Sequence, residues 1–301
     1  MKTLIACLFG VLSTLALSGC VTNEATGEQQ FMMLSRQDEI EIGEAGKAEM
    51  LKEMGGEVKN AALRQYVDRI GKSMARMTEG TNPTLPWEFI LVDSDMINAF
   101  AMPGGKVFVT RGLAAKMTNE AQLAAVLGHE IGHVTARHIN DRVTRMTGTA
   151  VLVEILAGVA GDDADSVREL GMQVATVALM PYDRNQESQS DSLGLRYMTR
   201  LNYNPVGMVQ LMEILEQSMQ GAHPPEWLST HPLPRTRIQR VGSEINSVYS
   251  QTQNNPAFKT GEAEFKSQFL QKLSFEPPAA HRPASNRYAA AGWCLHCAHS
   301  H

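Results

Sequence analysis

The stretch from Asn119 to His138 constrains the fold more than any other part of the chain. It reads NEAQLAAVLGHEIGHVTARH, an apolar, alanine-rich run that also carries three histidines and a glutamate. Asn119, with Gln122 three positions later, fits the capping box that begins a helix, so we predict a long helix from Asn119 to His138 or beyond. Histidine is uncommon in so apolar a helix, and its presence here indicates a specific role.

The first two of these histidines have the spacing of metal ligands. His129 and His133 are four residues apart, so on a helix they project from one face about one turn apart. That spacing suits two nitrogen ligands of a tetrahedral zinc ion. Glu130 lies beside them, turned away from the direct ligand direction but close enough to act on a water at the metal. The HExxH pattern is typical of zinc metallopeptidases, and the alternative is a pair of hydrogen-bonded core histidines.

His138 is a weaker candidate for a ligand. It lies five residues after His133, about 140° further round a continuous helix. The metzincin pattern would place glycine at 136 and histidine at 139, where this chain has Ala136 and Ile139. We therefore expect His138 to support a ligand or the helix end and not to bind the metal.

A third ligand is expected from a separate helix. The segment RNQESQSDSLG places Glu187 and Asp191 four residues apart, on one face of a predicted helix. A carboxylate there could reach the metal, while Asp191 could accept a hydrogen bond from the free nitrogen of a ligand histidine. The alternative is a solvated acidic helix face.

Three motifs in order, HExxH, ExxxD and STHPLPRTRI, resemble the superfamily of Ste-type prenyl-protein endopeptidases, HtpX and BepA/LoiP proteins, which are gluzincins. The likeness covers roughly residues 35–250. It implies one Zn²⁺ per chain, bound by His129, His133 and Glu187, with Asp191 behind the ligands. This chain reads ESQSD where relatives often read ESEAD, and both end residues are retained.

The resemblance also implies roles in peptide hydrolysis. Glu130 would take a proton from the attacking water and deliver it to the leaving amine. His231 and Arg237 match the family positions that stabilise the tetrahedral oxyanion. For His231 a second role stays open, in which it binds zinc in the resting enzyme and switches activity off. The alternatives are loop packing for His231 and a surface cation for Arg237.

A β-hairpin is predicted just before the histidine-bearing helix. The segment NAFAMPGGKVFVTRG has two short apolar runs around a Pro-Gly-Gly turn. Its first residues resemble the gluzincin edge strand that binds an extended peptide by backbone hydrogen bonds, namely Asn98, Ala99, Phe100 and Ala101. The alternative is a hairpin that only covers the core.

The first twenty residues predict export and lipid attachment. MKTLIACLFGVLSTLALSGC has an early lysine, an apolar run shorter than a membrane span, and a small-residue end. LSGC resembles a bacterial lipobox, which implies cleavage before Cys20 and acylation of its sulfur. Val21 at the next position favours the outer membrane over the inner one.

Four parts of the chain are expected: a signal peptide over 1–19, a lipidated tether over 20–34, a zinc metallopeptidase domain over 35–250, and a C-terminal extension over 251–301 that is largely disordered after about 275. We predict an α+β fold, mostly helical, with the gluzincin arrangement of a small sheet beside the active-site helix. Two further helices, at 148–160 and 166–179, are expected to form a lid or core hairpin, and the alternative for these apolar segments is a membrane hairpin. Near the end, Cys294 and Cys297 suit a local disulfide or adventitious metal binding and receive no catalytic role.

The predicted function is zinc-dependent endopeptidase activity on the periplasmic side of the bacterial outer membrane. Expected partners are misfolded or misassembled envelope proteins, membrane lipid through acylated Cys20, and the outer-membrane assembly machinery. A formal charge of −5 argues against nucleic acid as a partner. The alternative is a non-catalytic chaperone or assembly lipoprotein with the same fold.

Overall fold

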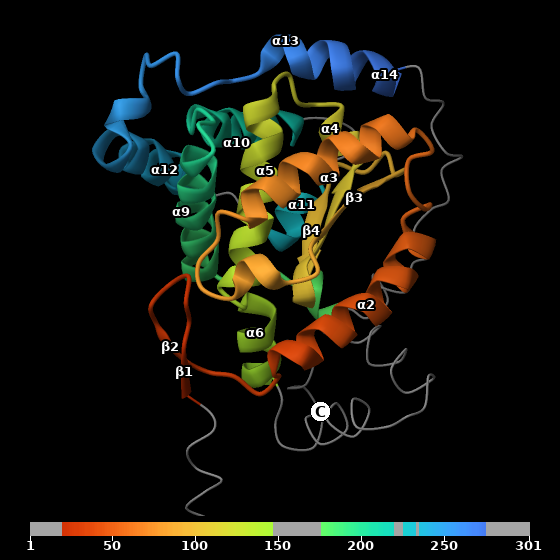
Figure 1. Ribbon diagram of the computed structural model, residues 1–301, viewed down its shortest axis with the longest axis vertical. Helices are drawn as coiled ribbons and strands as arrows, with labels where there is room; N and C mark the ends of the chain where they lie inside the picture. The colour runs from red at the N-terminus through yellow and green to blue at the C-terminus, as the bar shows by residue number, and fades with distance from the viewer. Residues whose placement is uncertain (1–19, 147–175, 220–224, 233–234, 275–301) are drawn as a thin grey trace, which may run out of the picture.

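The computed structural model describes residues 20–146, 176–219, 225–232 and 235–274. Within these ranges helices surround one small three-stranded sheet, which confirms the predicted α+β, mostly helical class. The helix α5 (Glu120–Thr135) runs through the middle, between the sheet and α9 (Arg184–Arg200) (Figure 1). The helix predicted over 148–160 and most of that over 166–179 lie outside the described residues.

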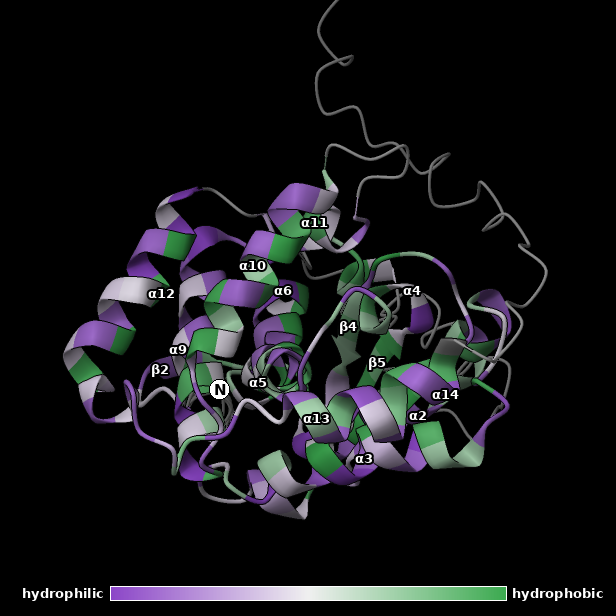
Figure 2. Cartoon of the chain, turned by 90° about the horizontal axis from the view of Figure 1, so that it is seen from above, coloured by the Kyte–Doolittle hydropathy of each residue, from purple (hydrophilic) through white to green (hydrophobic). Residues whose placement is uncertain are grey.

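The sheet has the order β3-β5-β4. Strands β4 (Ala99–Met102) and β5 (Lys106–Thr110) pair antiparallel around a Pro-Gly-Gly turn, so the predicted hairpin is confirmed. Strand β3 (Glu88–Val92) runs parallel to β5. Gly104 in the turn has φ +72°, and a side chain there would meet the backbone of Ile40 at 2.6 Å, so the turn requires glycine. Hydrophobic residues make up β4 and the middle of β5 (Figure 2).

In the described ranges, four further long helices surround the sheet and α5. Ser35 caps the first of them and shares a capping box with Asp38. The bounds are α2 Arg36–Glu53, α3 Ala61–Ala75, α10 Val206–Ser218 and α12 Arg235–Val248, with the short α4 Arg111–Ala114 and α11 Trp227–Thr230 between them.

Helix α5 differs from the prediction at both ends. Asn119 does cap it, but Gln122 accepts its hydrogen bond from the Thr118 amide at 2.7 Å, so the reciprocal half of the predicted capping box is wrong. The helix ends at Thr135 and not at His138, because Arg137 adopts a left-handed backbone with φ +57°. His138 instead begins the separate helix α6 (His138–Met146).

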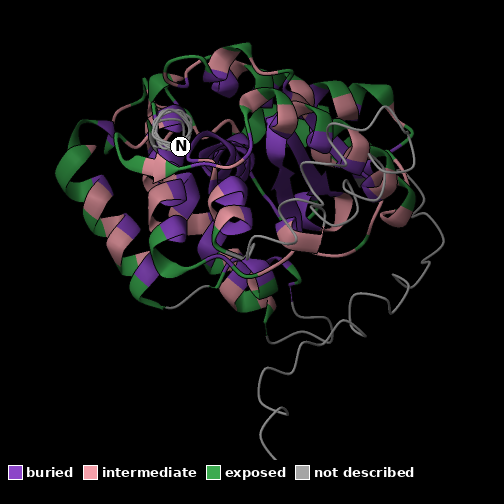
Figure 3. Cartoon of the chain, turned by 90° about the horizontal axis from the view of Figure 1, so that it is seen from below, coloured by how far each residue is buried: buried purple, intermediate pink, exposed green. Residues whose placement is uncertain are grey.

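The core is built around α5, every residue of which is buried. Figure 3 shows the buried residues concentrated in the central helix and the sheet. Helices α5 and α9 approach closely because glycines face the contact: a Cβ on Gly132 would lie 2.9 Å from Ser190 Cα, and one on Gly194 would lie 3.1 Å from the His129 nitrogen. This approach brings the two histidines of α5 and the two carboxylates of α9 together.

The N-terminal segment 20–34, predicted as a lipidated tether, contains regular structure. Strands β1 (Cys20–Thr22) and β2 (Gln29–Phe31) form an antiparallel hairpin. Its turn is held against the domain because Asn23 Nδ2 donates to the carbonyl of Thr135, 3.0 Å away.

The main core also extends past residue 250. After α12 the chain forms α13 (Glu262–Phe265), a π-helical turn and α14 (Gln271–Ser274). Phe265 and Phe269 are fully buried and contact the ring of Tyr66. In the described ranges, no helix combines the length and the apolar character that crossing a membrane requires.

Candidate metal centre

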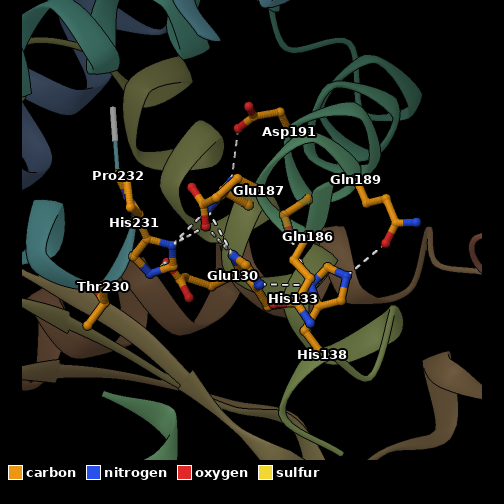
Figure 4. A network of polar contacts seen from close by, with 12 residues as sticks. Glu130, His133, His138, Gln186, Glu187, Gln189, Asp191, Thr230, His231 and Pro232 are labelled. Atoms are coloured by element: carbon orange, nitrogen blue, oxygen red, sulfur yellow. Dashed lines mark hydrogen bonds and ion pairs between the residues drawn. The ribbon is translucent and has the colours of Figure 1, made fainter. Parts of the chain in front are cut away.

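Four buried side chains from three elements converge at one point (Figure 4). His129 and His133 come from α5, Glu187 comes from the first turn of α9, and His231 directly follows α11. The start of α9 is fixed by Asp183, which forms a capping box with Gln186. This cap sets the position from which Glu187 reaches the histidines.

The distances within this cluster suit a tetrahedral ion. His129 Nε2 and His133 Nε2 lie 3.0 Å apart, and Glu187 Oε1 lies 3.3 Å from His133 Nε2. His231 Nδ1 lies 3.2 Å from His129 Nε2. Zinc bonds of 2.0–2.1 Å to nitrogen and oxygen separate tetrahedral ligand atoms by about 3.3 Å. The four groups therefore surround a space of the size that zinc requires.

A chain of hydrogen bonds sets the tautomer of His133. His138 Nε2 donates to Gln189 Oε1 at 2.9 Å, and burial lowers the pKa of His138 to about 4, so the ring is neutral. Its Nδ1 must then accept, which makes the Nδ1 of His133, 2.9 Å away, the donor. The Nε2 of His133 is left with a free lone pair aimed into the cluster.

The other histidine of α5 is oriented by Asp191. His129 Nδ1 and Asp191 Oδ1 lie 3.0 Å apart, so Nδ1 donates and Nε2 again carries the lone pair. Arg237 donates two hydrogen bonds of 2.8 Å to Asp191, and Arg240 adds one of 2.7 Å. Burial alone would raise the pKa of Asp191, but the charge and hydrogen bonds of Arg237 hold it at about 2.

These residues fit a bound zinc ion. Two nitrogen lone pairs only 3.0 Å apart repel each other unless a cation lies between them. Burial lowers the pKa of His129, yet the carboxylates of Glu187 and Asp191 raise it to about 9, so the pocket favours a positive charge at Nε2, which either a proton or a metal ion in its place supplies. Two imidazoles and one carboxylate are a common zinc donor set.

Glu130 lies at the same point but faces away from the ligand atoms. Its Oε1 accepts a hydrogen bond of 3.2 Å from Trp227 Nε1, and His231 Nε2 lies 3.6 Å from the same oxygen. Its Oε2 is buried without a hydrogen-bond partner among the described residues. A fully buried carboxyl oxygen without a partner is suited to bind a water or a substrate group.

Comparison with known proteins assigns the chain to a family. The model of peptidase family M48 matches residues 61–245, which is more than half of the chain. The chain belongs to peptidase family M48. This confirms the resemblance seen in the sequence.

Several M48 relatives carry names. The chain is 31% identical over 199 residues to the "Beta-barrel assembly-enhancing protease" of Escherichia coli strain K12, covering 64% of this chain and 40% of the relative. It is 32% identical over 194 residues to the protein of that name from Yersinia pestis, covering 62% and 40%. It is 29% identical over 174 residues to "Mitochondrial metalloendopeptidase OMA1" of Arabidopsis thaliana, covering 56% and 35%. The chain thus spans about 40% of the length of the bacterial relatives that it matches.

The structure adds Tyr182 to this M48 site, which sequence reasoning missed. Its ring stacks on His133 with centroids 3.7 Å apart and on His231 at 5.0 Å, and Arg142 lies over it at 4.1 Å. The Tyr182 amide donates to the carbonyl of Thr230, so the tyrosine also holds the loop that carries His231. Its position just before the helix cap at 183 was the only signal in the sequence.

Strand β4, which was predicted to bind substrate, lies at an edge of the three-stranded sheet in the described part of the chain. Ala99, Phe100 and Ala101 are buried, and both amide atoms of Asn98 are buried without partners in the described ranges. The Trp227 amide donates to the carbonyl of Ile97, so the loop bearing His231 is attached to the start of this strand.

Proposed function

We propose that the chain is a zinc-dependent endopeptidase in which His129, His133 and Glu187 bind the metal. The observation that carries the proposal is the pair of Nε2 atoms 3.0 Å apart, each with its lone pair free because its Nδ1 donates elsewhere. Glu187 Oε1, 3.3 Å from the second of them, supplies the negative charge. A zinc ion held there would polarise the peptide carbonyl and activate water for attack.

The residues of the chain would handle the proton and the substrate. Glu130, with Oε2 free of partners among described residues, takes the proton of the attacking water and passes it to the leaving amine. An extended peptide would pair with the backbone of β4, beside α5. Asn98 precedes this strand, and both of its amide atoms are buried without partners in the described ranges, so they would be free to bond a peptide once the site opens.

The position of His231 supports a closed resting state. Its Nδ1 lies 3.2 Å from His129 Nε2 and 2.8 Å from Glu187 Oε1, among the proposed ligand atoms. In this conformation it would take the fourth metal position, and it would have to move aside before a substrate enters. Trp227 and Tyr182 stack on its ring and oppose that movement.

Replacing His231 with alanine separates its two proposed roles. Raised cleavage of an unfolded protein with normal zinc content supports the closed resting state, because the fourth position is freed. Lost cleavage with normal zinc supports the oxyanion role. Wild-type cleavage and wild-type zinc affinity together would reject both.

Arg237 is better suited to positioning than to binding the oxyanion. Its Nε and Nη2 donate to Asp191, while Nη1 pairs with Glu187 and contacts the carbonyl of Pro232. Each nitrogen therefore already has an acceptor within the protein. We propose that Arg237 orients two carboxylates, that of Glu187 within the zinc site and that of Asp191 behind it.

The proposed substrates are misfolded or misassembled proteins of the bacterial envelope, met at the periplasmic side of the outer membrane. Backbone pairing on β4 would accept unfolded chains with little sequence selectivity. The names of the bacterial relatives support a link to β-barrel assembly. The proposed acylation of Cys20 would supply the anchor, and Cys20→Ala should then release the protein from the membrane fraction.

Metal analysis tests the proposed site directly. Purified protein should contain one zinc per chain, and a chelator should abolish cleavage of unfolded casein. His129→Ala and Glu187→Ala should each lose the metal. Glu262→Ala should keep it, because Glu262 is an exposed residue outside the four-residue cluster. Unchanged zinc in the first two variants would reject the proposed ligands.

A further inference from the structure

We propose that the open end of the β1–β2 hairpin, formed by Val21 and Phe31 beside Cys20, rests on the membrane surface and holds the metal centre at a fixed orientation above it. The proposal rests on the acylation of Cys20 put forward above. It adds a lipid-contacting protein surface to the predicted lipidated tether over 20–34.

The first observation is that two apolar side chains are exposed at this end. Phe31 is 56% exposed and Val21 is 46% exposed, and they are two of the four large hydrophobic residues exposed in the described part of the chain. Val21 pairs with Gln30 and Phe31 pairs with Cys20, so the two side chains project from opposite faces at the same end of the hairpin. Each exposed apolar side chain is costly in water. Such side chains are favourable in the boundary layer of a membrane.

The second observation is the register. Phe31 is the residue that pairs directly with Cys20. Cα atoms of antiparallel partners lie about 4.5 to 5.5 Å apart, and each polar layer of a bilayer is roughly 5 to 8 Å deep. Once acyl chains on Cys20 enter the hydrocarbon, Phe31 must therefore lie within or against that layer.

The charges in the hairpin lie away from the proposed contact. Neither strand has a charged residue, since β1 reads CVT and β2 reads QQF. The two carboxylates, Glu24 and Glu28, lie in the turn at the other end, and Glu24 is held by the amide and hydroxyl of Thr81, each at 2.9 Å. An anionic lipid surface would thus meet the uncharged end of the hairpin and not its acidic turn.

The hairpin is attached firmly to the helix of the metal centre. Asn23 Nδ2 donates to the carbonyl of Thr135 at 3.0 Å, and Gln30 Nε2 donates to that of Ala136 at 3.2 Å. These carbonyls belong to the last turn of α5, where the helix leaves its own acceptors free. Figure 1 shows the hairpin beside the ends of α9 and α6. Membrane contact is in this way coupled to the helix that carries His129 and His133.

A functional consequence follows for substrate choice. A metal centre held close to the membrane by the β1–β2 hairpin can reach unfolded substrate proteins at the membrane surface. It reaches soluble substrates far from the membrane poorly. The proposed endopeptidase would therefore select by location, which compensates for the low sequence selectivity of backbone pairing.

Photo-crosslinking from position 31 tests the proposal. Full-length protein carrying Phe31→p-benzoylphenylalanine is produced with its lipid, placed in vesicles of phosphatidylethanolamine and phosphatidylglycerol, and irradiated. The matched control is Val248→p-benzoylphenylalanine, because Val248 is similarly exposed, at 59%, on α12. We expect several-fold more phospholipid adduct from position 31 than from position 248.

Each other result overturns the proposal. Equal lipid adducts at the two positions would show contact without orientation, and a protein adduct at position 31 would show that another chain covers the patch. Mass analysis without acyl groups on Cys20 would remove the premise. Zinc content and cleavage of a soluble peptide, measured on the same sample, decide the proposed catalytic function independently.

A second variant tests the functional consequence. Phe31→Ser should slow cleavage of a vesicle-bound unfolded protein several-fold and leave cleavage of a soluble peptide unchanged, because the exposed side chain contributes nothing to the core. Val248→Ser should change neither rate. Equal rates for Phe31→Ser and the wild type on the vesicle-bound substrate would contradict selection by location.

Discussion

The Nδ1 atoms of His133 and His138 lie 2.9 Å apart and share a hydrogen bond, and His138 Nε2 donates a second hydrogen bond to Gln189. This pair fixes which nitrogen of His133 is free. We expect His138→Ala to weaken zinc affinity by about 10- to 100-fold, the usual effect of removing a partner behind a metal ligand. Competition with a zinc-binding dye measures the change. Gln189→Ala should cause a smaller loss, and unchanged affinity in both variants would show that His133 needs no such support.

The close contact between α5 and α9 should be sensitive to one methyl group. A Cβ at Gly132 would lie 2.9 Å from the backbone of Ser190, so Gly132→Ala must push α9 away and move its carboxylates from the histidines. We expect a loss of about 1–3 kcal/mol in the free energy of unfolding, together with weaker zinc binding.

The matched control for this change is Gly242→Ala. It places the same methyl group on α12, where nothing lies within 4 Å, so stability should rise by about 0.5–1 kcal/mol. Denaturant unfolding measures both variants. Equal stabilities for the two would contradict the packing account.

The C-terminal segment should contribute stability that depends on pH through Glu120. Burial raises the pKa of this carboxyl, but hydrogen bonds from Lys259, Tyr66 and Tyr203 outweigh it and leave the pKa lowered. Two of those bonds, from Tyr203 and Lys259, are 2.7 Å long. A lowered folded-state pKa stabilises the protein above the unfolded value of about 4.3 and loses its effect as pH falls below it.

Glu120→Gln should therefore be less stable than the wild type at pH 7, and the difference should shrink as pH falls below about 4. Thermal unfolding across this pH range measures it. Glu262→Gln, an exposed neighbour in α13, should unfold like the wild type. A Glu120→Gln difference that persists unchanged in acid would argue against the ionised network.

Arg237 should matter for stability as well as for activity. Arg237→Gln leaves Asp191 and Glu187 as buried carboxylates without their main cation, which costs about 3–5 kcal/mol. Arg240→Gln removes a partly exposed partner of the same Asp191 and should cost less than about 1 kcal/mol. Urea unfolding of both variants checks this. If Arg237→Gln is as stable as the wild type but inactive, the arginine acts on the reaction and not on the carboxylates.

The sequence predicted the features that depend on local spacing. Helix geometry alone predicts that His129 and His133 share one helix face, and that Glu187 and Asp191 share another, since side chains four residues apart lie on the same face. The hairpin before α5 likewise follows from one short segment, in which a Pro-Gly-Gly turn lies between two apolar runs. Family resemblance was needed to bring Glu187 and His231 to the same point.

Features that depend on distant contacts could not be predicted. Arg137, whose left-handed backbone follows the end of α5, is held by Glu39 and by the carbonyl of Leu34, about a hundred residues earlier. The β1–β2 hairpin is held by helix carbonyls that no local pattern reveals. Tyr182 reaches the metal centre only because its amide bonds to the loop at Thr230.

Glu130 tests the central claim, since the proposed enzyme needs its carboxylate and the proposed zinc site does not. Glu130→Gln keeps the size of the side chain and its Oε1 contact with Trp227 while it removes the base. The measurement is cleavage of unfolded casein by zinc-loaded protein, with zinc content determined on the same sample. We predict one zinc per chain and a cleavage rate lowered by about 10²- to 10⁴-fold. Cleavage at the wild-type rate by a variant that retains its zinc would contradict the account.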